Sequence, residues 1–229
     1  MGRARTPTAD DTARVVGVTG PHQGEQTVTA GTSLDGASAA VVLVHGRGAT
    51  ARGILGMTTE LPDGVAYLAP QAARRTWYPN SFLEPVDRNE PGRSSGLARL
   101  DKLVERAGNA GLDPGRVVLV GFSQGGCLAS EFVARNPRRY GGLAALSGGL
   151  IGESVDRDSY DGSLAGTPVF LGCSDTDPHI PAERVRETAT VFDERGADVD
   201  VRLYEGMGHT VNADELAAVS GLIERTREH

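Results

Sequence analysis

Short apolar runs alternate with longer amphipathic segments along most of the chain. The runs are rich in β-branched residues and several lack polar alternation, which is typical of strands covered on both faces of a parallel sheet. They predict strands at 26–30, 39–44, 65–68, 117–120, 142–146, 168–171 and 199–204, with a further short strand at 14–18. Helical periodicity predicts helices around 97–110, 126–136, 181–195 and 213–227. This alternation predicts an α/β fold with a mostly parallel central sheet flanked by helices.

The 229 residues are enough for one domain with a full core around such a sheet. The polar segment 1–12 is expected to be disordered, which leaves a single domain over 13–229. Only polar turns lie between 147 and 166, so the chain offers no room there for a separate lid domain. We therefore expect a site above the sheet to be open.

Composition and charge limit the classes of partner. Hydrophobic residues make up 39% of the chain and charged residues 23%, and no apolar run is long enough to span a membrane. The formal net charge of -7 and the scattered arginines argue against a nucleic-acid partner, since phosphate binding needs a clustered basic face. The N-terminus lacks the apolar core of a signal peptide, so a cytoplasmic location is expected. Nothing in the composition indicates a homo-oligomer.

The chain contains 2 cysteines, Cys127 and Cys173. Two are too few for a disulfide framework, and their spacing is not that of zinc ligands. Cys127 lies in a predicted helix and Cys173 follows an apolar strand, so both are interpreted as buried, reduced packing residues.

The strand predicted at 117–120 ends abruptly at Gly121-Phe122-Ser123-Gln124-Gly125, which fits the pattern G-x-S-x-G. In this pattern the two glycines let strand and helix approach closely, and the serine sits on a strained turn with its hydroxyl above the sheet. Ser123 is therefore a candidate nucleophile. The alternative is that Ser123 only caps the following helix, which is a common role for serine. The strand-turn-helix context favours the nucleophile.

A serine nucleophile needs a base, and in this architecture the order along the chain is serine, acid, then histidine. Position separates the five histidines. His22 precedes the predicted catalytic strands, His45 ends an early strand, His179 lies beside the acid candidates and His229 is the last residue. His209 follows the last predicted strand, in a loop before a helix. We interpret His209 as the base, the alternative being a polar surface residue.

Two carboxylates compete for the role of the acid that orients the base. Asp175 and Asp177 lie two residues apart after the strand at 168–171, and this spacing does not separate them. Pro178 restricts Asp177 to an extended backbone, which suits a carboxylate held rigidly toward an imidazole. Asp175, between Ser174 and Thr176, has the surroundings of a turn residue that bonds its own backbone. Asp177 is the favoured acid and Asp175 the alternative.

The segment His45-Gly46-Arg47-Gly48 follows the strand at 39–44. In G-x-S-x-G hydrolases, two backbone amides bind the oxyanion that forms on attack, one directly after the nucleophile and one in such an upstream loop. The predicted donors are the amides of Gln124 and Arg47. The alternative interpretation of this segment is a plain glycine-rich turn.

The connection at 70–96 is long, contains prolines and glycines, and carries the single tryptophan. Long ordered connections in compact domains are often binding elements. Trp77, Tyr78 and Phe82 are candidates for lining a pocket, with Trp77 and Tyr78 as the predicted substrate-binding pair. The alternative is that these aromatic side chains only fasten the loop to the body of the protein.

Four motifs together carry a family resemblance: HGRG at 45–48, GFSQGG at 121–126, DPHIP at 177–181 and GMGH at 206–209. As a set they resemble the carboxylesterase/phospholipase family that includes the acyl-protein thioesterases, small α/β-hydrolases without a lid. The resemblance runs from about Val41 to the C-terminus, and TWYPNSF at 76–82 resembles the family's loop near the pocket. It implies that the nucleophile, orienting acid, base and oxyanion-hole amides are those of Ser123, Asp177, His209, and Arg47 with Gln124.

Two departures from the family's pattern bear on the substrate. The family often has aspartate where this chain has Ala49, and the turn from Gly172 to Asp177 is one residue longer here.

The combined prediction is a serine hydrolase that cleaves small-molecule carboxylic esters or thioesters of small to medium acyl groups through an acyl-enzyme, with no metal or cofactor. The alternatives are perhydrolase or lactonase chemistry on the same residues, and a protein of this fold that binds a ligand without turnover.

Overall fold

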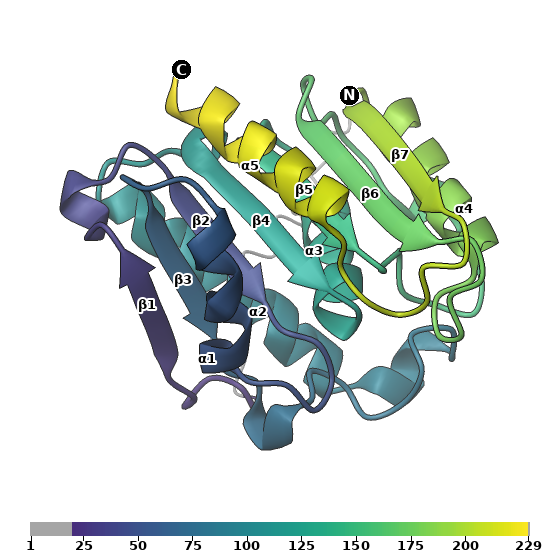
Figure 1. The fold of residues 1–229 in the computed structure, drawn as a ribbon. Coiled ribbons are helices and arrows are strands. Elements are labelled where there is room, and N and C mark those ends of the chain that lie inside the picture. Colours follow the sequence, from purple (N-terminus) through teal and green to yellow (C-terminus); the bar gives the residue numbers. More distant parts are fainter. Residues whose placement is uncertain (1–19, 229) are drawn as a thin grey trace, which may run out of the picture.

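Within residues 20–228, the part of the chain that the computed structural model describes, seven strands form one sheet in the order β1-β3-β2-β4-β5-β6-β7 (Figure 1). Only β1 pairs antiparallel, with β3, and every other pairing in this part of the chain is parallel. The predicted mostly parallel sheet is confirmed, whereas the predicted segment 1–12 and strand 14–18 lie outside the described residues. The strands are β1 (Thr27–Gly31), β2 (Ala40–Val44), β3 (Ala66–Pro70), β4 (Val117–Phe122), β5 (Gly142–Leu146), β6 (Pro168–Ser174) and β7 (Asp198–Tyr204).

The central strands are buried on both faces, as their continuous apolar sequences require. Every residue of β2, β3 and β5 is buried. The edge strand β7 differs, because its sequence alternates charged and apolar residues and all of its positions are partly or fully exposed. The register of β4 against β2 pairs Gly121 with Val44, so the carboxyl ends of these two strands lie side by side.

Helices cover both faces of the sheet (Figure 1). On one face, α2, α3 and α4 bury a cluster that includes Leu100, Leu128 and Phe192. On the other face, α1 and α5 bury Ile54 and Val219. With both faces covered, the loops at the carboxyl edge of the sheet are left to form a site. The helices are α1 (Ala51–Ile54), α2 (Gly92–Asn109), α3 (Gln124–Arg135), α4 (Ala182–Glu194) and α5 (Ala213–Arg227).

Helix α2 begins at Gly92, earlier than the predicted start at 97. Its first residues, Gly-Arg-Ser-Ser-Gly, have no apolar periodicity, so the pattern did not include them. Close packing holds them instead. A Cβ atom at Gly92 would lie 2.6 Å from the Trp77 carbonyl oxygen, and one at Gly96 would lie 3.0 Å from the Leu128 side chain. The four-residue helix α1 was not predicted, because it is too short to show a period.

The connection between β5 and β6 contains a single helical element, the 3-10 turn Arg157–Ser159. In the described part of the chain, no inserted domain covers the carboxyl edge of the sheet at this connection, as predicted from its length. None of the helices within residues 20–228 combines the length and the apolar character that crossing a bilayer requires.

Candidate active site

Ser123 occupies a sharp turn between β4 and α3. Its φ of 54° and ψ of -122° lie outside the regions that L-residues favour, and the positive φ carries strain. The Ser123 amide donates to the Leu146 carbonyl oxygen at 2.9 Å, which fastens the turn to β5. The side chain makes no capping hydrogen bond to α3. The alternative that Ser123 only caps this helix is therefore wrong.

The two glycines that flank Ser123 allow the backbone to approach more closely than any side chain permits. A Cβ atom at Gly121 would lie 2.3 Å from the Gly125 carbonyl oxygen, and one at Gly125 would lie 2.0 Å from the Val44 carbonyl oxygen. Both obstacles are backbone atoms, which cannot rotate away as a side chain does. The close packing of this turn against α3 and β2 therefore depends on these glycines.

Gly125→Ala should destabilise the folded protein by about 3 kcal/mol or more, because the backbone of β2 must move to admit the methyl group. Gly108→Ala in α2 is the matched control, since no atom beyond its own turn of the helix lies within 4 Å of a Cβ there and alanine favours a helix by up to about 1 kcal/mol. Urea unfolding of the two variants measures the difference. Equal stability of the two variants would contradict the steric argument.

A chain of hydrogen bonds joins three side chains at the carboxyl edge of the sheet. His209 Nε2 lies 2.9 Å from Ser123 Oγ, and His209 Nδ1 lies 2.7 Å from Asp177 Oδ2. Asp177 Oδ1 accepts hydrogen bonds from the backbone N–H groups of His179 at 2.8 Å and Ile180 at 3.0 Å.

The charge on Asp177 determines which nitrogen of His209 carries the proton. Burial opposes ionisation of Asp177, but the hydrogen bonds from His209 and the two backbone amides outweigh it and hold the pKa of this carboxyl below its ordinary value. An ionised Asp177 accepts from Nδ1–H of the imidazole, which leaves Nε2 free to accept a proton from Ser123. The three predicted residues thus form a relay with the polarity that a nucleophilic serine needs.

Asp175 contacts the loop that carries the histidine and not the histidine itself. Its Oδ1 accepts the Gly206 N–H at 2.9 Å, and the neighbouring Ser174 Oγ accepts the Gly208 N–H at 3.1 Å. The prediction that Asp175 bonds its own backbone is wrong, because the loop after β7 lies close enough to supply the donor. Both contacts fix the loop on which His209 lies.

Two backbone amides beside the serine are free to bind an oxyanion. Within residues 20–228, the N–H groups of Arg47 and Gln124 donate to no protein acceptor. The two segments pack closely at Gly46, where a Cβ atom would lie 3.3 Å from the Phe122 carbonyl oxygen. Unpaired amides beside a nucleophilic serine are the usual means of binding the charge that develops on a substrate carbonyl.

His45, which the sequence placed only at the end of a strand, is fully buried and fixes this loop. Its Nε2 accepts the Ala72 N–H at 3.1 Å, so Nδ1 carries the proton and donates to the Gly46 carbonyl oxygen at 2.8 Å. Burial lowers the pKa of His45, which keeps the ring neutral. The signal in the sequence was a histidine at the end of an apolar run, although its partners were not predictable.

A cleft of about 460 Å³ opens beside Ser123 and His209. Its walls include the side chains of Tyr78, Phe82 and Ile180, all of which are largely buried. The long connection at 70–96 thus supplies one wall of the cleft, and Tyr78 and Phe82 lie where the sequence predicted them.

Trp77 does not line this cleft, contrary to the prediction. It is fully buried, its indole N–H donates to the His45 carbonyl oxygen at 2.8 Å, and its backbone N–H donates to Gln124 Oε1 at 2.8 Å. Gln124 Nε2 in turn donates to the Tyr78 carbonyl oxygen at 2.8 Å. The Gln124 side chain, which the sequence did not single out, therefore ties the aromatic segment to the turn at Ser123.

Glu131 in α3 is a second residue that the sequence did not single out. Its carboxylate is fully buried and accepts from Arg93 at 2.5 Å, from the Tyr160 hydroxyl at 3.1 Å and from the Ile151 N–H at 3.2 Å, with Arg135 as a further partner. A buried carboxylate needs such partners. The cluster ties α2 and the β5–β6 connection to α3. Its only signal in the sequence was a glutamate among the apolar residues of α3.

Cys127 and Cys173 are free and buried, as predicted. Burial raises the pKa of each thiol to about 12, so both stay protonated at neutral pH. In the part of the chain that is described, no three His, Cys, Asp or Glu side chains are grouped so as to hold a metal ion.

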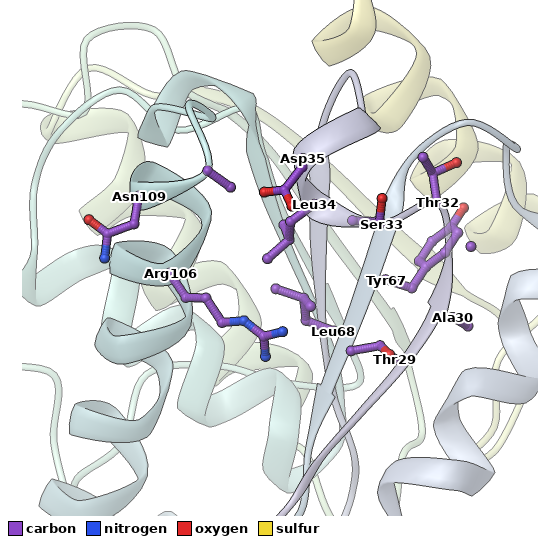
Figure 2. Close-up of a pocket in the computed structure, with 13 residues that line it drawn as sticks. Thr29, Ala30, Thr32, Ser33, Leu34, Asp35, Tyr67, Leu68, Arg106 and Asn109 are labelled. Atoms are coloured by element: carbon purple, nitrogen blue, oxygen red, sulfur yellow. The ribbon is translucent and has the colours of Figure 1, made fainter.

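A larger hollow of about 570 Å³ lies between β1, β3 and the end of α2 (Figure 2). Asp35, Tyr67 and Arg106 are among the residues that line it. Ala66, the first residue of β3, also lines it, so this hollow lies at the amino edge of the parallel strands, opposite to Ser123. Its lining contains no histidine, so the hydroxyl groups there lack a base. The candidate active site is therefore the smaller cleft.

Comparison with known proteins agrees with this geometry. The phospholipase/carboxylesterase family model matches residues 28–227. The chain belongs to this family. The predictions of an α/β-hydrolase fold and of a carboxylesterase-type hydrolase acting on ester bonds are thereby confirmed.

This family member has relatives of known structure and of curated sequence. The crystal structure of a phospholipase/carboxylesterase from Dyadobacter fermentans DSM 18053 is 38% identical, with a TM-score of 0.86 over 91% of this chain and 100% of that chain. Acyl-protein thioesterase 1 of Gibberella zeae is 27% identical over 82% of this chain and 90% of its own length. Acyl-protein thioesterase 1 of Kluyveromyces lactis is 31% identical over 55% of this chain, and the match spans only 56% of that relative.

In this family member, a buried glutamate caps α5, the helix that follows the loop carrying His209. Glu215 Oε2 accepts the Asn212 N–H at 2.9 Å, and Asn212 Oδ1 accepts the Glu215 N–H at 2.8 Å. Glu215 Oε1 is buried without a hydrogen-bond partner in the described structure. Burial raises the pKa of Glu215 from 4.5 to about 7, since the charged form loses its water.

This pKa predicts a pH-dependent cost of folding. As the pH rises from 4.5 to about 7, the unfolded chain releases the Glu215 proton while the folded protein keeps it, so the free energy of unfolding falls. The loss from this residue amounts to about 3 kcal/mol and is constant at higher pH. Glu215→Gln keeps an acceptor for the Asn212 amide and removes the charge. Urea unfolding across this pH range measures the free energy of unfolding of both proteins. The difference between the variant and the wild type should rise by about 3 kcal/mol in favour of the variant as the pH rises. A difference that does not change with pH would contradict the argument.

Proposed function

We propose that this protein hydrolyses carboxylic esters through an acyl-enzyme on Ser123. One observation carries the proposal: the unbroken hydrogen-bond chain from Ser123 through His209 to Asp177, at a cleft beside two unpaired amides. Each part of that arrangement has a use in acyl transfer, and a protein that only binds a ligand needs none of them together.

In the proposed reaction, Ser123 Oγ attacks the ester carbonyl while His209 Nε2 takes the hydroxyl proton. The carbonyl oxygen becomes negatively charged and accepts hydrogen bonds from the amides of Arg47 and Gln124. His209, held by Asp177, then protonates the leaving alcohol as the carbon–oxygen bond breaks. Water attacks the acyl-enzyme by the same route, and the acid product leaves with Ser123 restored.

The proposed substrates carry small to medium acyl groups. The β5–β6 connection places no inserted domain over the cleft of about 460 Å³, so nothing in this connection extends the cleft into an enclosed tunnel for a long acyl chain. Thioesters undergo the same acyl transfer, and two relatives are named acyl-protein thioesterase 1. A thioester is therefore included among the proposed substrates.

The test is a series of 4-nitrophenyl esters from acetate through butyrate and octanoate to palmitate, together with butyryl thiocholine as a thioester. We expect kcat/KM to be highest for the esters of short and medium chains and to fall toward palmitate. No hydrolysis of any member of the series by the purified protein would overturn the proposed function. A maximum at palmitate would leave ester hydrolysis standing and overturn the proposed acyl size.

A further inference from the structure

The cleft beside Ser123 has an unusual charge for this protein. The whole chain carries a formal net charge of -7, but no Asp or Glu side chain lines the cleft. Arg47 lines it with a permanent positive charge, and His179 and His209 are the other ionisable nitrogen groups in its wall. Among residues 20–228, Arg47 is therefore the one side chain in the cleft wall with a permanent charge, and the ionised Asp177 lies behind His209 and outside the wall.

The guanidinium group of Arg47 is held in place but not neutralised. Its Nη1 donates to the Pro79 carbonyl oxygen at 2.9 Å, and its Nη2 donates to the Asn80 carbonyl oxygen at 2.6 Å. Its Cζ atom lies 6.0 Å from the centroid of the Tyr78 ring. No carboxylate among residues 20–228 pairs with it. Of the five N–H donors of a guanidinium group, those not used by the two carbonyl groups remain for a ligand.

The rest of the wall has the opposite character. Phe82 and Ile180 are apolar and buried. Burial raises the pKa of Cys127 to about 12 and that of the Tyr78 hydroxyl well above its ordinary value, so both groups are neutral at physiological pH. The cleft thus offers a neutral, largely buried wall and, at its exposed side, one fixed positive charge.

Resting on the proposed ester hydrolysis, we propose that the preferred substrates carry a carboxylate in addition to the scissile ester, and that Arg47 binds this carboxylate. A single fixed positive charge matches a carboxylate, whereas a phosphate monoester carries nearly two negative charges at neutral pH. The backbone amide of Arg47 is a proposed oxyanion donor, so the distance from the reacting carbonyl to the carboxylate is limited to about one arginine side chain plus the hydrogen bond at each end. Half-esters of short dicarboxylic acids and esters of short hydroxy acids meet this condition.

Two pairs of esters test the proposal, each pair differing by one negative charge. On the acyl side, 4-nitrophenyl hydrogen glutarate is compared with 4-nitrophenyl valerate. On the alcohol side, 3-carboxyphenyl butyrate is compared with its methyl ester. The quantity measured is the ratio of kcat/KM for the charged ester to that for the neutral ester. In at least one pair, we expect Arg47→Met to lower this ratio about tenfold, and Arg47→Lys to keep most of it.

Arg225→Met is the matched control, because Arg225 lies near the C-terminal end of α5 and does not line the cleft. The ratio of kcat/KM for the charged ester to that for the neutral ester should be the same in Arg225→Met as in the wild type. The proposal is overturned if Arg47→Met leaves both ratios unchanged, or if Arg47→Lys lowers them as far as Arg47→Met, which would mean that Arg47 acts only by holding the loop at Pro79 and Asn80. In either case hydrolysis of the neutral esters leaves the proposed function intact. No hydrolysis of any of the four esters by the wild type would overturn both.

Discussion

Ser123→Ala should lower kcat by about 10⁵- to 10⁶-fold while leaving the protein folded. Alanine has no oxygen to attack the carbonyl and no hydroxyl proton for His209 to accept. The substitution removes only one oxygen, and the Ser123 side chain makes no capping hydrogen bond to α3. We therefore expect the N-terminus of α3 to be unchanged. Initial rates with saturating 4-nitrophenyl butyrate measure the loss, and circular dichroism checks the fold.

Ser130→Ala supplies a control for this result. Ser130 is a fully buried serine of the same helix, and its hydroxyl has no hydrogen-bond partner in the described structure. We expect its activity to stay within a few-fold of the wild type. If Ser123→Ala retained as much activity as Ser130→Ala, the nucleophile would have to be sought elsewhere.

Asp177→Asn should lower kcat by about 10⁴-fold, because it changes which nitrogen of His209 carries the proton. Asp177 Oδ1 accepts from the amides of His179 and Ile180, so the asparagine must keep its oxygen there. Its NH₂ group then faces His209 Nδ1 at the position of Oδ2. An NH₂ donor there requires Nδ1 to accept, which moves the ring proton to Nε2 and prevents that nitrogen from accepting the Ser123 proton.

Asp175→Asn is the matched control for this substitution, two residues away on the same turn. The asparagine oxygen can still accept the Gly206 N–H that Asp175 accepts, so we expect less than about a tenfold loss of kcat. Steady-state kinetics of the two variants, with circular dichroism to exclude unfolding, give the ranking. A larger loss of kcat for Asp175→Asn than for Asp177→Asn would contradict the assignment of Asp177 as the acid.

The sheet and the relay could be predicted because their signals are local. The apolar runs of β2 and β4 follow from burial on both faces, which excludes polar residues from every position. The turn at Ser123 is fixed by glycines within two residues of it. Asp177 could be favoured over Asp175 because the proline that follows it restricts its backbone.

The parts that were missed depend on residues far away in the chain. His45 holds the loop at Gly46 and Arg47 through an amide 27 residues away, and Glu131 pairs with Arg93 at a separation of 38 residues. Trp77 looked like a pocket residue, but the packing of α2 and the turn at Gln124 enclose it. Such contacts follow from the tertiary arrangement, which residue spacing alone does not encode.

The most direct test of the proposed function is covalent labelling of the nucleophile. The purified protein is treated with a fluorophosphonate probe, digested and mapped by mass spectrometry, and ester hydrolysis is followed in parallel. We predict one phosphonylated residue, Ser123, with hydrolysis lost in proportion to labelling and no adduct on the Ser123→Ala variant. An adduct confined to another residue, or hydrolysis that continues after Ser123 is fully labelled, would contradict the assignment of Ser123 as the nucleophile.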